Sequence, residues 1–150
     1  MLPDFPQTVL LIDDDPAWTQ LVQYRLAHAW SAPPVMLHTA ASLETGLVVL
    51  WTQPIDLVLL DLGLPGCSDV AAVKALVQAM LQSGGLRPIV VLSAYLTDPL
   101  RRHILTLGGQ ESICKDDPDL WQALTAAMQR AWDRHRFQQR PQGKDPDAPA

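Results

Sequence analysis

The stretch that decides the fold of this chain is IDLVLLDLGLPG, residues 55–66. It begins as a nearly continuous apolar run, which is typical of a strand buried on both faces of a parallel sheet. The run stops at the carboxylate of Asp61, and a turn containing Gly and Pro follows at once. An ionisable group at the end of a buried strand is costly unless something compensates or uses it, and open α/β sheets hold their ligands at the carboxyl ends of strands. Asp61 is therefore the first candidate for a functional residue.

Strand-like and helix-like segments alternate along the chain. Apolar runs predict four more strands, at residues 8–12, 35–39, 87–93 and 111–115. Amphipathic spacing predicts helices over about 16–30, 43–53, 69–81 and 99–107, and a last helix that runs past Trp132. Asp-Pro pairs at 15–16, 98–99 and 117–118 mark helix starts, with Asp as the cap and Pro as the first helical residue. Five strands alternating with five helices predict an α/β fold with a doubly wound parallel sheet.

The length and composition are those of one globular domain. The chain has 150 residues, of which 48% are hydrophobic and 18% charged, values typical of a folded domain rather than a disordered chain. We expect residues 1–140 to form this domain, ending in an extended last helix, and the Pro-rich tail 141–150 to be disordered. A net charge of -5 disfavours nucleic-acid binding, because no excess of cations is present to neutralise phosphates.

Several features indicate a cytoplasmic location. Cys67 and Cys114 are too few for a disulfide scaffold, and we interpret both as free thiols in a reducing compartment. The N-terminus lacks the basic start and apolar centre of a signal peptide. No apolar run approaches the length needed to span a bilayer, so no membrane association is expected.

Polar and charged groups stand at the predicted ends of four strands: Asp13 and Asp14, Asp61, Ser93 and Lys115. Right-handed crossovers bring these ends to one edge of the sheet. Like charges about 4 Å apart repel by on the order of 4 kcal/mol at an effective dielectric near 20, which is tolerable if a divalent cation sits among them. Carboxylate oxygens suit Mg²⁺. A carboxylate nucleophile with Mg²⁺, an ammonium and a hydroxyl around it predicts phosphorylation on aspartate.

The chain resembles the response-regulator receiver domains, the CheY-like family of bacterial two-component signalling. Four pieces match in order and spacing, at residues 10–16, 59–65, 89–94 and 108–115, and the resemblance covers about 8 to 135. It implies a flavodoxin-like fold with strand order 2-1-3-4-5. It also implies a stand-alone signalling module that takes a phosphoryl group from a sensor histidine kinase. Such a module is not a metabolic enzyme, since it catalyses only its own phosphorylation and dephosphorylation.

The resemblance implies a role for each residue at this edge. Asp61 would be the phosphoacceptor, Asp14 a direct Mg²⁺ ligand, Asp13 a ligand through water, and the carbonyl of Gly63 a further ligand. Ser93 and Lys115, at the matching positions, would contact the phosphoryl group, and the serine would move when the phosphoryl group arrives.

The chain departs from the family pattern at three places. The family usually has an aromatic residue three positions before the lysine, where this chain has Ser112, and Tyr95 is a candidate substitute. The proline that normally follows the lysine is replaced by Asp116, and the Gly expected a few residues after Pro65 is replaced by Asp69. The residue two after the phosphoacceptor tunes hydrolysis in this family. Since Gly63 has no side chain to position water, we expect slow self-dephosphorylation.

The last predicted helix carries two apolar stripes where one would suffice for docking on the sheet. The first contains Leu120, Leu124, Ala127 and Ala131, and the second contains Trp121, Met128 and Trp132. The second stripe is either more core or an exposed patch used for association. We hypothesise a homodimer through this helix, because Trp132 and Phe137 lie beyond the usual end of the fold.

Two other functions remain open. A degenerate receiver that is never phosphorylated and serves only for docking would explain Ser112 and Asp116. A phosphohydrolase of the haloacid-dehalogenase type would use the Asp-x-Asp within residues 13–15, but it would leave Asp61 without a role.

Overall fold

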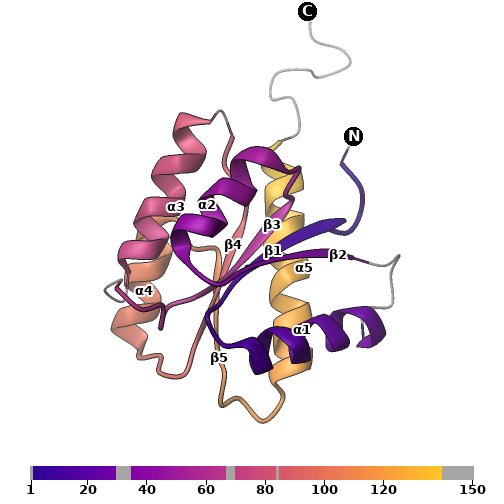
Figure 1. Ribbon diagram of the computed structural model, residues 1–150, viewed down its shortest axis with the longest axis vertical. Helices are drawn as coiled ribbons and strands as arrows, with labels where there is room; N and C mark the ends of the chain where they lie inside the picture. Colours follow the sequence, from indigo (N-terminus) through magenta and orange to yellow (C-terminus); the bar gives the residue numbers. More distant parts are fainter. Residues whose placement is uncertain (1, 30–34, 67–69, 84, 140–150) are drawn as a thin grey trace, which may run out of the picture.

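The computed structural model describes residues 2–29, 35–66, 70–83 and 85–139 (Figure 1). The strands are β1 (Thr8–Ile12), β2 (Met36–Ala40), β3 (Leu57–Asp61), β4 (Ile89–Ser93) and β5 (Glu111–Cys114). The helices are α1 (Pro16–Ala29), α2 (Leu43–Thr52), α3 (Ala71–Gln82), α4 (Asp98–Leu107) and α5 (Leu120–Gln138). All strand pairs are parallel, in the order β2-β1-β3-β4-β5. The predicted doubly wound α/β fold and its strand order are confirmed.

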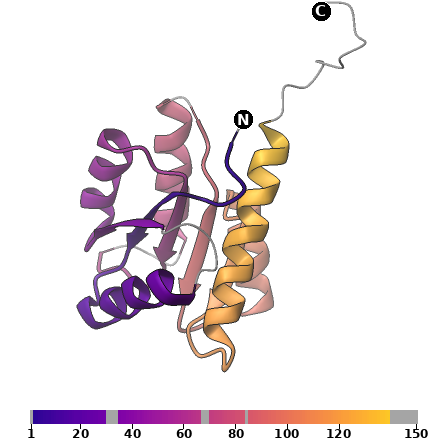
Figure 2. The ribbon, with the colours of Figure 1, turned by 90° about the vertical axis from the view of Figure 1, so that its right-hand side faces the viewer.

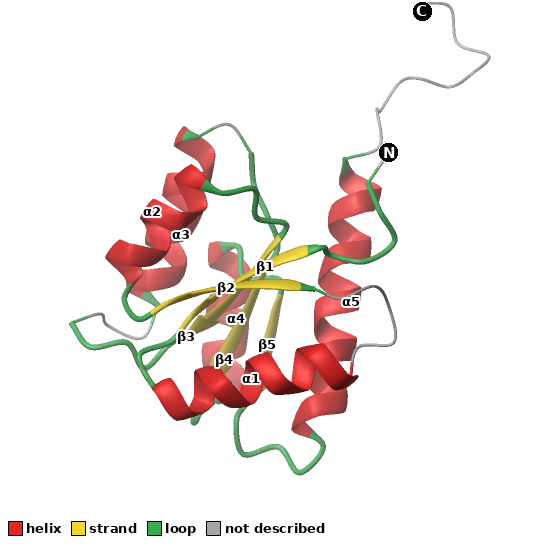
Figure 3. Cartoon of the chain, turned by 45° about the vertical axis from the view of Figure 1, so that its right-hand side comes forward, coloured by secondary structure: helices red, strands yellow, loops and turns green. Residues whose placement is uncertain are grey.

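The sheet lies between two layers of helices (Figure 3). Alternate side chains of each strand point to opposite faces, because the side-chain period of a strand is two. Leu10 and Ile12 pack with α2, α3 and α4, whereas Val9 and Leu11 pack with α1 and α5. Both faces of the sheet are therefore covered, which explains why the strands β1, β3 and β4 are nearly continuous apolar runs rather than alternating ones.

Strand β3 is the centre of the sheet and is buried along its whole length. It pairs with β1 on one side and with β4 on the other, and Leu57 to Leu60 are all 0% exposed. Asp61, its last residue, is only 6% exposed. The apolar run thus carries a carboxylate to the edge of the sheet while keeping it largely out of solvent.

Asp-Pro pairs in the sequence predict the starts of α1, α4 and α5 to within a few residues of their observed positions. Asp15 accepts hydrogen bonds from the backbone N–H groups of the first turn of α1, as expected for its Asp-Pro pair. The cap of α4, however, is Thr97, whose hydroxyl accepts from the N–H of Leu100 at 3.2 Å, so Asp98 is the first helical residue rather than the cap. Asp117 forms a turn, its carboxylate accepting from the N–H of Asp119 at 2.8 Å, and α5 begins at Leu120.

Strand boundaries shift by one or two residues. Strand β2 covers 36–40 instead of 35–39, and β3 and β4 begin two residues after their apolar runs. The predicted helix end at Trp30, the start at Asp69 and the disordered tail at 141–150 lie outside the described residues, as does Cys67.

The N-terminal segment lies along the last part of α5 (Figure 2). Trp132 is 1% exposed and its Nε1–H donates to the carbonyl of Pro3 at 2.8 Å. Arg136 forms an ion pair with Asp4, and Met128 is fully buried. These two members of the second stripe, Trp132 and Met128, therefore belong to the core instead of an exposed patch. None of the helices in the described part of the chain combines the length and apolar character needed to cross a membrane.

Candidate functional site

Three carboxylates converge at the carboxyl edge of the sheet. Asp13 directly follows β1, and Asp61 ends β3, which pairs with β1 so that Ile12 lies opposite Leu60. Asp14 follows Asp13, and one carboxylate oxygen from each of the three residues lies within 4.8 Å of the others. The predicted acids are therefore neighbours in space, brought together by the parallel register of two central strands.

The three carboxylates differ in their exposure to solvent. Asp13 is 3% exposed and Asp61 6%, whereas Asp14 is exposed. Asp13 Oδ1 accepts from the N–H of Asp15 at 2.9 Å, and Asp61 Oδ1 accepts from the N–H of Gly63 at 3.1 Å. Burial raises the pKa of Asp13, and the hydrogen bond from Asp15 and the ammonium of Lys115 only partly offset it.

Lys115 supplies the positive charge of the cluster. It follows β5, and its N–H donates to the carbonyl of Ser93 at the end of β4. Its Nζ lies 3.0 Å from Asp13 Oδ2 and 3.4 Å from Asp61 Oδ1. One ammonium thus bridges the two buried carboxylates, which would otherwise repel each other without compensation.

The donor set fits a magnesium ion. Mg²⁺ takes oxygen ligands in an octahedron with bonds of about 2.1 Å, so opposite ligands lie ~4.2 Å apart. The oxygens of Asp13, Asp14 and Asp61 lie within 4.8 Å of one another, which a small side-chain rotation would close. Gly63 is adjacent, since its N–H is bonded to Asp61. The residues present therefore suit the cation, with the exposed carboxylate of Asp14 open to it.

Ser93 lies at the same edge, but its hydroxyl is turned to the backbone of the following loop. Its Oγ donates to the carbonyl of Tyr95 at 2.9 Å and accepts from the N–H of the same residue at 3.2 Å. The register places Ser93 beside Cys114, one residue before Lys115. A contact between this hydroxyl and a group on Asp61 requires the loop bonds to Tyr95 to break.

The position of the missing aromatic is held by an arginine from α4. Arg101 Nη1 donates to the carbonyl of Ser112 at 2.7 Å and to its hydroxyl at 3.3 Å. Tyr95 is 84% exposed. Hydrogen bonds between α4 and β5 are therefore formed at the position where the family usually has an aromatic side chain, and Tyr95 is exposed to solvent.

Sequence reasoning missed Trp18 as a neighbour of the cluster. The Nζ of Lys115 lies over the Trp18 ring, 4.8 Å from its centroid, and the ring stacks on Trp121 from α5. The sequence does contain an indication of this role, because Trp18 is an aromatic residue in the first turn of the helix that follows the acidic residues. Trp121 was assigned only to an apolar stripe.

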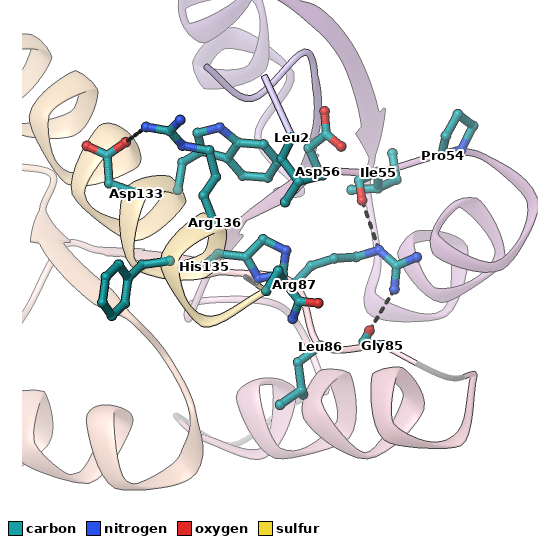
Figure 4. Close-up of a pocket in the computed structure, with 13 residues that line it drawn as sticks. Leu2, Pro54, Ile55, Asp56, Gly85, Leu86, Arg87, Asp133, His135 and Arg136 are labelled. Carbon is teal, nitrogen blue, oxygen red and sulfur yellow. Dashed lines mark hydrogen bonds and ion pairs between the residues drawn. The ribbon is translucent and has the colours of Figure 1, made fainter. Parts of the chain in front are cut away.

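A pocket lies at the opposite end of the sheet (Figure 4). Its volume is about 1080 Å³, and it is formed by the segments that precede β3 and β4 together with the end of α5. Arg87 crosses it, donating to the carbonyls of Ile55 and Gly85 (Figure 4). The three acids and Lys115 are not among its lining residues. The acidic cluster is therefore an open site at the sheet edge, separate from this pocket.

Comparison with known proteins agrees with this geometry. The family model described as the response regulator receiver domain matches residues 9–126. The chemotaxis response regulator CheY4 of Vibrio cholerae is 22% identical, with a TM-score of 0.68 over 83% of this chain and 97% of that one. A response regulator receiver domain protein from Clostridium thermocellum is 20% identical, with a TM-score of 0.71 over 87% and 98% of the two chains. None of the curated proteins compared with the chain matches it significantly.

Proposed function

The chain belongs to the response regulator receiver domain family, and from that premise we propose that it accepts a phosphoryl group on Asp61 from a sensor histidine kinase. The observation that carries the proposal is the convergence of Asp13, Asp14 and Asp61 around the ammonium of Lys115. Asp61 would otherwise be a buried carboxylate at a strand end with no use, which is an unfavourable arrangement.

The reaction is a transfer from a phosphohistidine to a carboxylate. A carboxylate oxygen of Asp61 attacks phosphorus, a P–O bond forms, the P–N bond to the histidine breaks, and the imidazole leaves with the electron pair and takes a proton from solvent. Asp61 Oδ1 accepts the N–H of Gly63 and faces Lys115. Within the described residues Oδ2 accepts no hydrogen bond, so it is the oxygen open to a ligand.

Positive charge around the phosphoryl oxygens would provide most of the catalysis. We propose that Asp13, Asp14, Asp61 and the carbonyl of Gly63 hold Mg²⁺, which when bound neutralises charge on the phosphoryl oxygens. Lys115 lies beside Asp61, with its Nζ 3.4 Å from Asp61 Oδ1, and would pair with one phosphoryl oxygen.

Ser93 would contribute the last contact. Its hydroxyl, now bonded to the backbone of Tyr95, would donate to a phosphoryl oxygen after the loop has rearranged. Breaking those two bonds is the movement that would carry the phosphorylation signal into the loop between β4 and α4.

The protein would act as a signalling module of the cytoplasm rather than as a metabolic enzyme. Phosphorylation would change its contacts with other proteins, and no small-molecule turnover is needed. Hydrolysis of its own aspartyl phosphate would end the signal.

A homodimer through α5 is part of the proposal. Trp132 is buried within its own chain, so it is not available to a partner. Phe137, near the end of α5, is 69% exposed and provides an apolar contact there. Light scattering at micromolar protein, with Phe137→Ala as the comparison, tests this: a monomeric mass for the unsubstituted chain would contradict it.

The decisive experiment uses a small phosphodonor. Incubation with acetyl phosphate and Mg²⁺, read by intact mass, is expected to add one phosphoryl group to the protein and none to Asp61→Asn. A protein that stays unmodified despite bound Mg²⁺ would instead support the degenerate receiver.

The phosphohydrolase alternative has its own signature. Turnover of a small phosphate ester that is lost in Asp13→Asn but kept in Asp61→Asn would identify that activity and overturn the receiver function. We expect no such turnover, because Asp61 is one of the three converging carboxylates.

A further inference from the structure

The ammonium of Lys115 has a third neighbour besides the two acids. Its Nζ lies over the ring of Trp18, 4.8 Å from the centroid, while it pairs with Asp13 and Asp61. A cation within about 6 Å of an indole face is attracted by the ring quadrupole. The lysine is therefore held from two sides, by carboxylates of the sheet edge and by a ring of α1.

The Trp18 ring is part of a larger stack that reaches across two helices. Trp18 from α1 and Trp121 from α5 stack with centroids 5.5 Å apart and an interplanar angle of 21°. The guanidinium of Arg25 lies 5.2 Å from the centroid of Trp121. Two cations therefore flank a pair of indoles, and one of these cations is the lysine of the phosphorylation site.

Packing alone does not explain an indole at position 18. Trp18 Nε1 is buried and has no hydrogen-bond partner among the described residues, and an unsatisfied buried donor is destabilising. A phenyl or branched aliphatic side chain would fill the space without that cost. The indole has the strongest cation-binding face of the aromatic side chains, so the benefit lies in its contact with Lys115.

The position at which the family usually has an aromatic residue is taken up by a different contact in this chain. Arg101 ties α4 to Ser112 of β5, and Tyr95 is 84% exposed. Among the described residues, the rings linked to Lys115 are instead those of Trp18 and Trp121, between α1 and α5.

We propose that Trp18 is a positioning residue for Lys115, and that the Trp18–Trp121 stack repacks when a phosphoryl group on Asp61 draws the ammonium away. Phosphorylation would then be read at the face formed by α1 and α5. This inference rests on the proposed function of Asp61. Its physical basis is that a doubly charged phosphoryl group on Asp61 attracts Lys115 more strongly than the carboxylate of Asp13 and the ring of Trp18 do.

A double-mutant cycle tests the positioning role. Trp18→Leu is expected to slow phosphorylation by acetyl phosphate about tenfold, while Trp18→Phe, which keeps a ring, loses about threefold or less. In a Lys115→Ala background, Trp18→Leu should have no further effect, because the ring would act through the lysine. Equal losses in both backgrounds would show that Trp18 only supports the fold and would overturn the inference.

A fluorescence measurement tests the readout and uses only the conservative variant. Phosphorylation should change the tryptophan emission of the unsubstituted protein, and this change should be strongly reduced in Trp18→Phe, which removes one of the two stacked indoles. The matched control is Trp51→Phe, since Trp51 is 57% exposed on α2, in the other helix layer. A change of full size in Trp18→Phe would contradict the proposal.

The two hypotheses fail in different ways. If the unsubstituted protein gains no phosphoryl group by intact mass, the proposed function of Asp61 fails and this inference fails with it. If it is phosphorylated but the cycle is additive or the emission change keeps its full size in Trp18→Phe, only the role of Trp18 fails.

Discussion

The Nζ of Lys115 and the Oδ2 of Asp13 lie 3.0 Å apart, although 102 residues separate them in the sequence. The pair joins the end of the first strand to the end of the last, across the two strands between them in the sheet. Asp13 is 3% exposed, so its charge depends on this partner. Removing one member of a buried ion pair leaves the other charge buried without a partner. The resulting loss of stability is much larger than the net stabilisation that the intact pair provides.

Lys115→Met is expected to destabilise the protein in the absence of metal. Asp13 and Asp61 lose their shared cation, and a loss of about 3 kcal/mol is typical when one partner of a buried pair is removed. Mg²⁺ should recover a larger part of the stability in this variant than in the unsubstituted protein, because it replaces the missing charge. Urea unfolding at pH 7 with and without Mg²⁺ measures both effects. An equal response of the two proteins to Mg²⁺ would contradict this prediction.

Asp14→Asn is expected to weaken Mg²⁺ binding without lowering the stability of the metal-free protein. Asp14 is exposed, and within the described residues its side chain makes no hydrogen bond or ion pair. Its removal also relieves repulsion from Asp13 and Asp61. Titration calorimetry measures the affinity for Mg²⁺, and urea unfolding without metal measures the stability. An unchanged Mg²⁺ affinity would exclude Asp14 as a ligand.

The aspartyl phosphate of this protein is expected to be long-lived. A Cβ placed at Gly63 would lie 3.5 Å from Asp61 Oδ1, an ordinary contact, so a side chain at this position would reach the phosphoryl site without strain. In the native chain no such side chain is present to orient an attacking water. Gly63→Asn should therefore shorten the lifetime, measured by mass after removal of the phosphodonor. A native lifetime of seconds would show that Gly63 does not slow hydrolysis.

His135 is expected to reduce stability as the pH falls. Burial lowers the pKa of His135 below its ordinary 6.5, and Arg87 lowers it further, while Asp56 acts in the opposite direction. Arg87 and His135 lie beside each other in the pocket (Figure 4). Below pH 6.5 the unfolded chain therefore binds more protons, and stability falls as the pH drops through the folded pKa.

The matched variant for this pH effect is His135→Gln. It should show a shallower fall in the free energy of unfolding between pH 7 and about 5, measured by urea titration at each pH. Identical pH profiles for the two proteins would exclude His135 as a source of acid sensitivity.

Trp132→Phe is expected to cost stability although it keeps an aromatic ring in the core. The substitution removes the bond from Nε1 to the carbonyl of Pro3 and leaves unfilled volume, together worth about 2 kcal/mol. Phe137→Ala is the control, because Phe137 is 69% exposed and its loss should cost far less. Thermal unfolding of the two variants provides the measurement, and equal losses would contradict the assignment of Trp132 to the core.

Most of the fold is encoded in consecutive residues. The apolar runs define five strands, and the runs that become β1, β3 and β4 indicate a sheet covered on both faces, because only a strand covered on both faces can be apolar throughout. The Asp15-Pro16 pair marks the start of α1 through bonds within one turn. Where the prediction was wrong by a few residues, as at Thr97 and Asp119, a neighbouring cap or turn competed for the same backbone N–H groups.

What the sequence determined by itself is the α/β class, the acids at the strand ends and the family, because each depends on neighbours along the chain. The tertiary structure decided which distant groups meet: Lys115 between Asp13 and Asp61, its ammonium over Trp18, Arg101 on Ser112, and Trp132 beneath the N-terminal segment. These contacts join segments far apart in the chain or on different elements. They follow from strand order and from the packing of helices on the two faces, and residue spacing alone does not encode either.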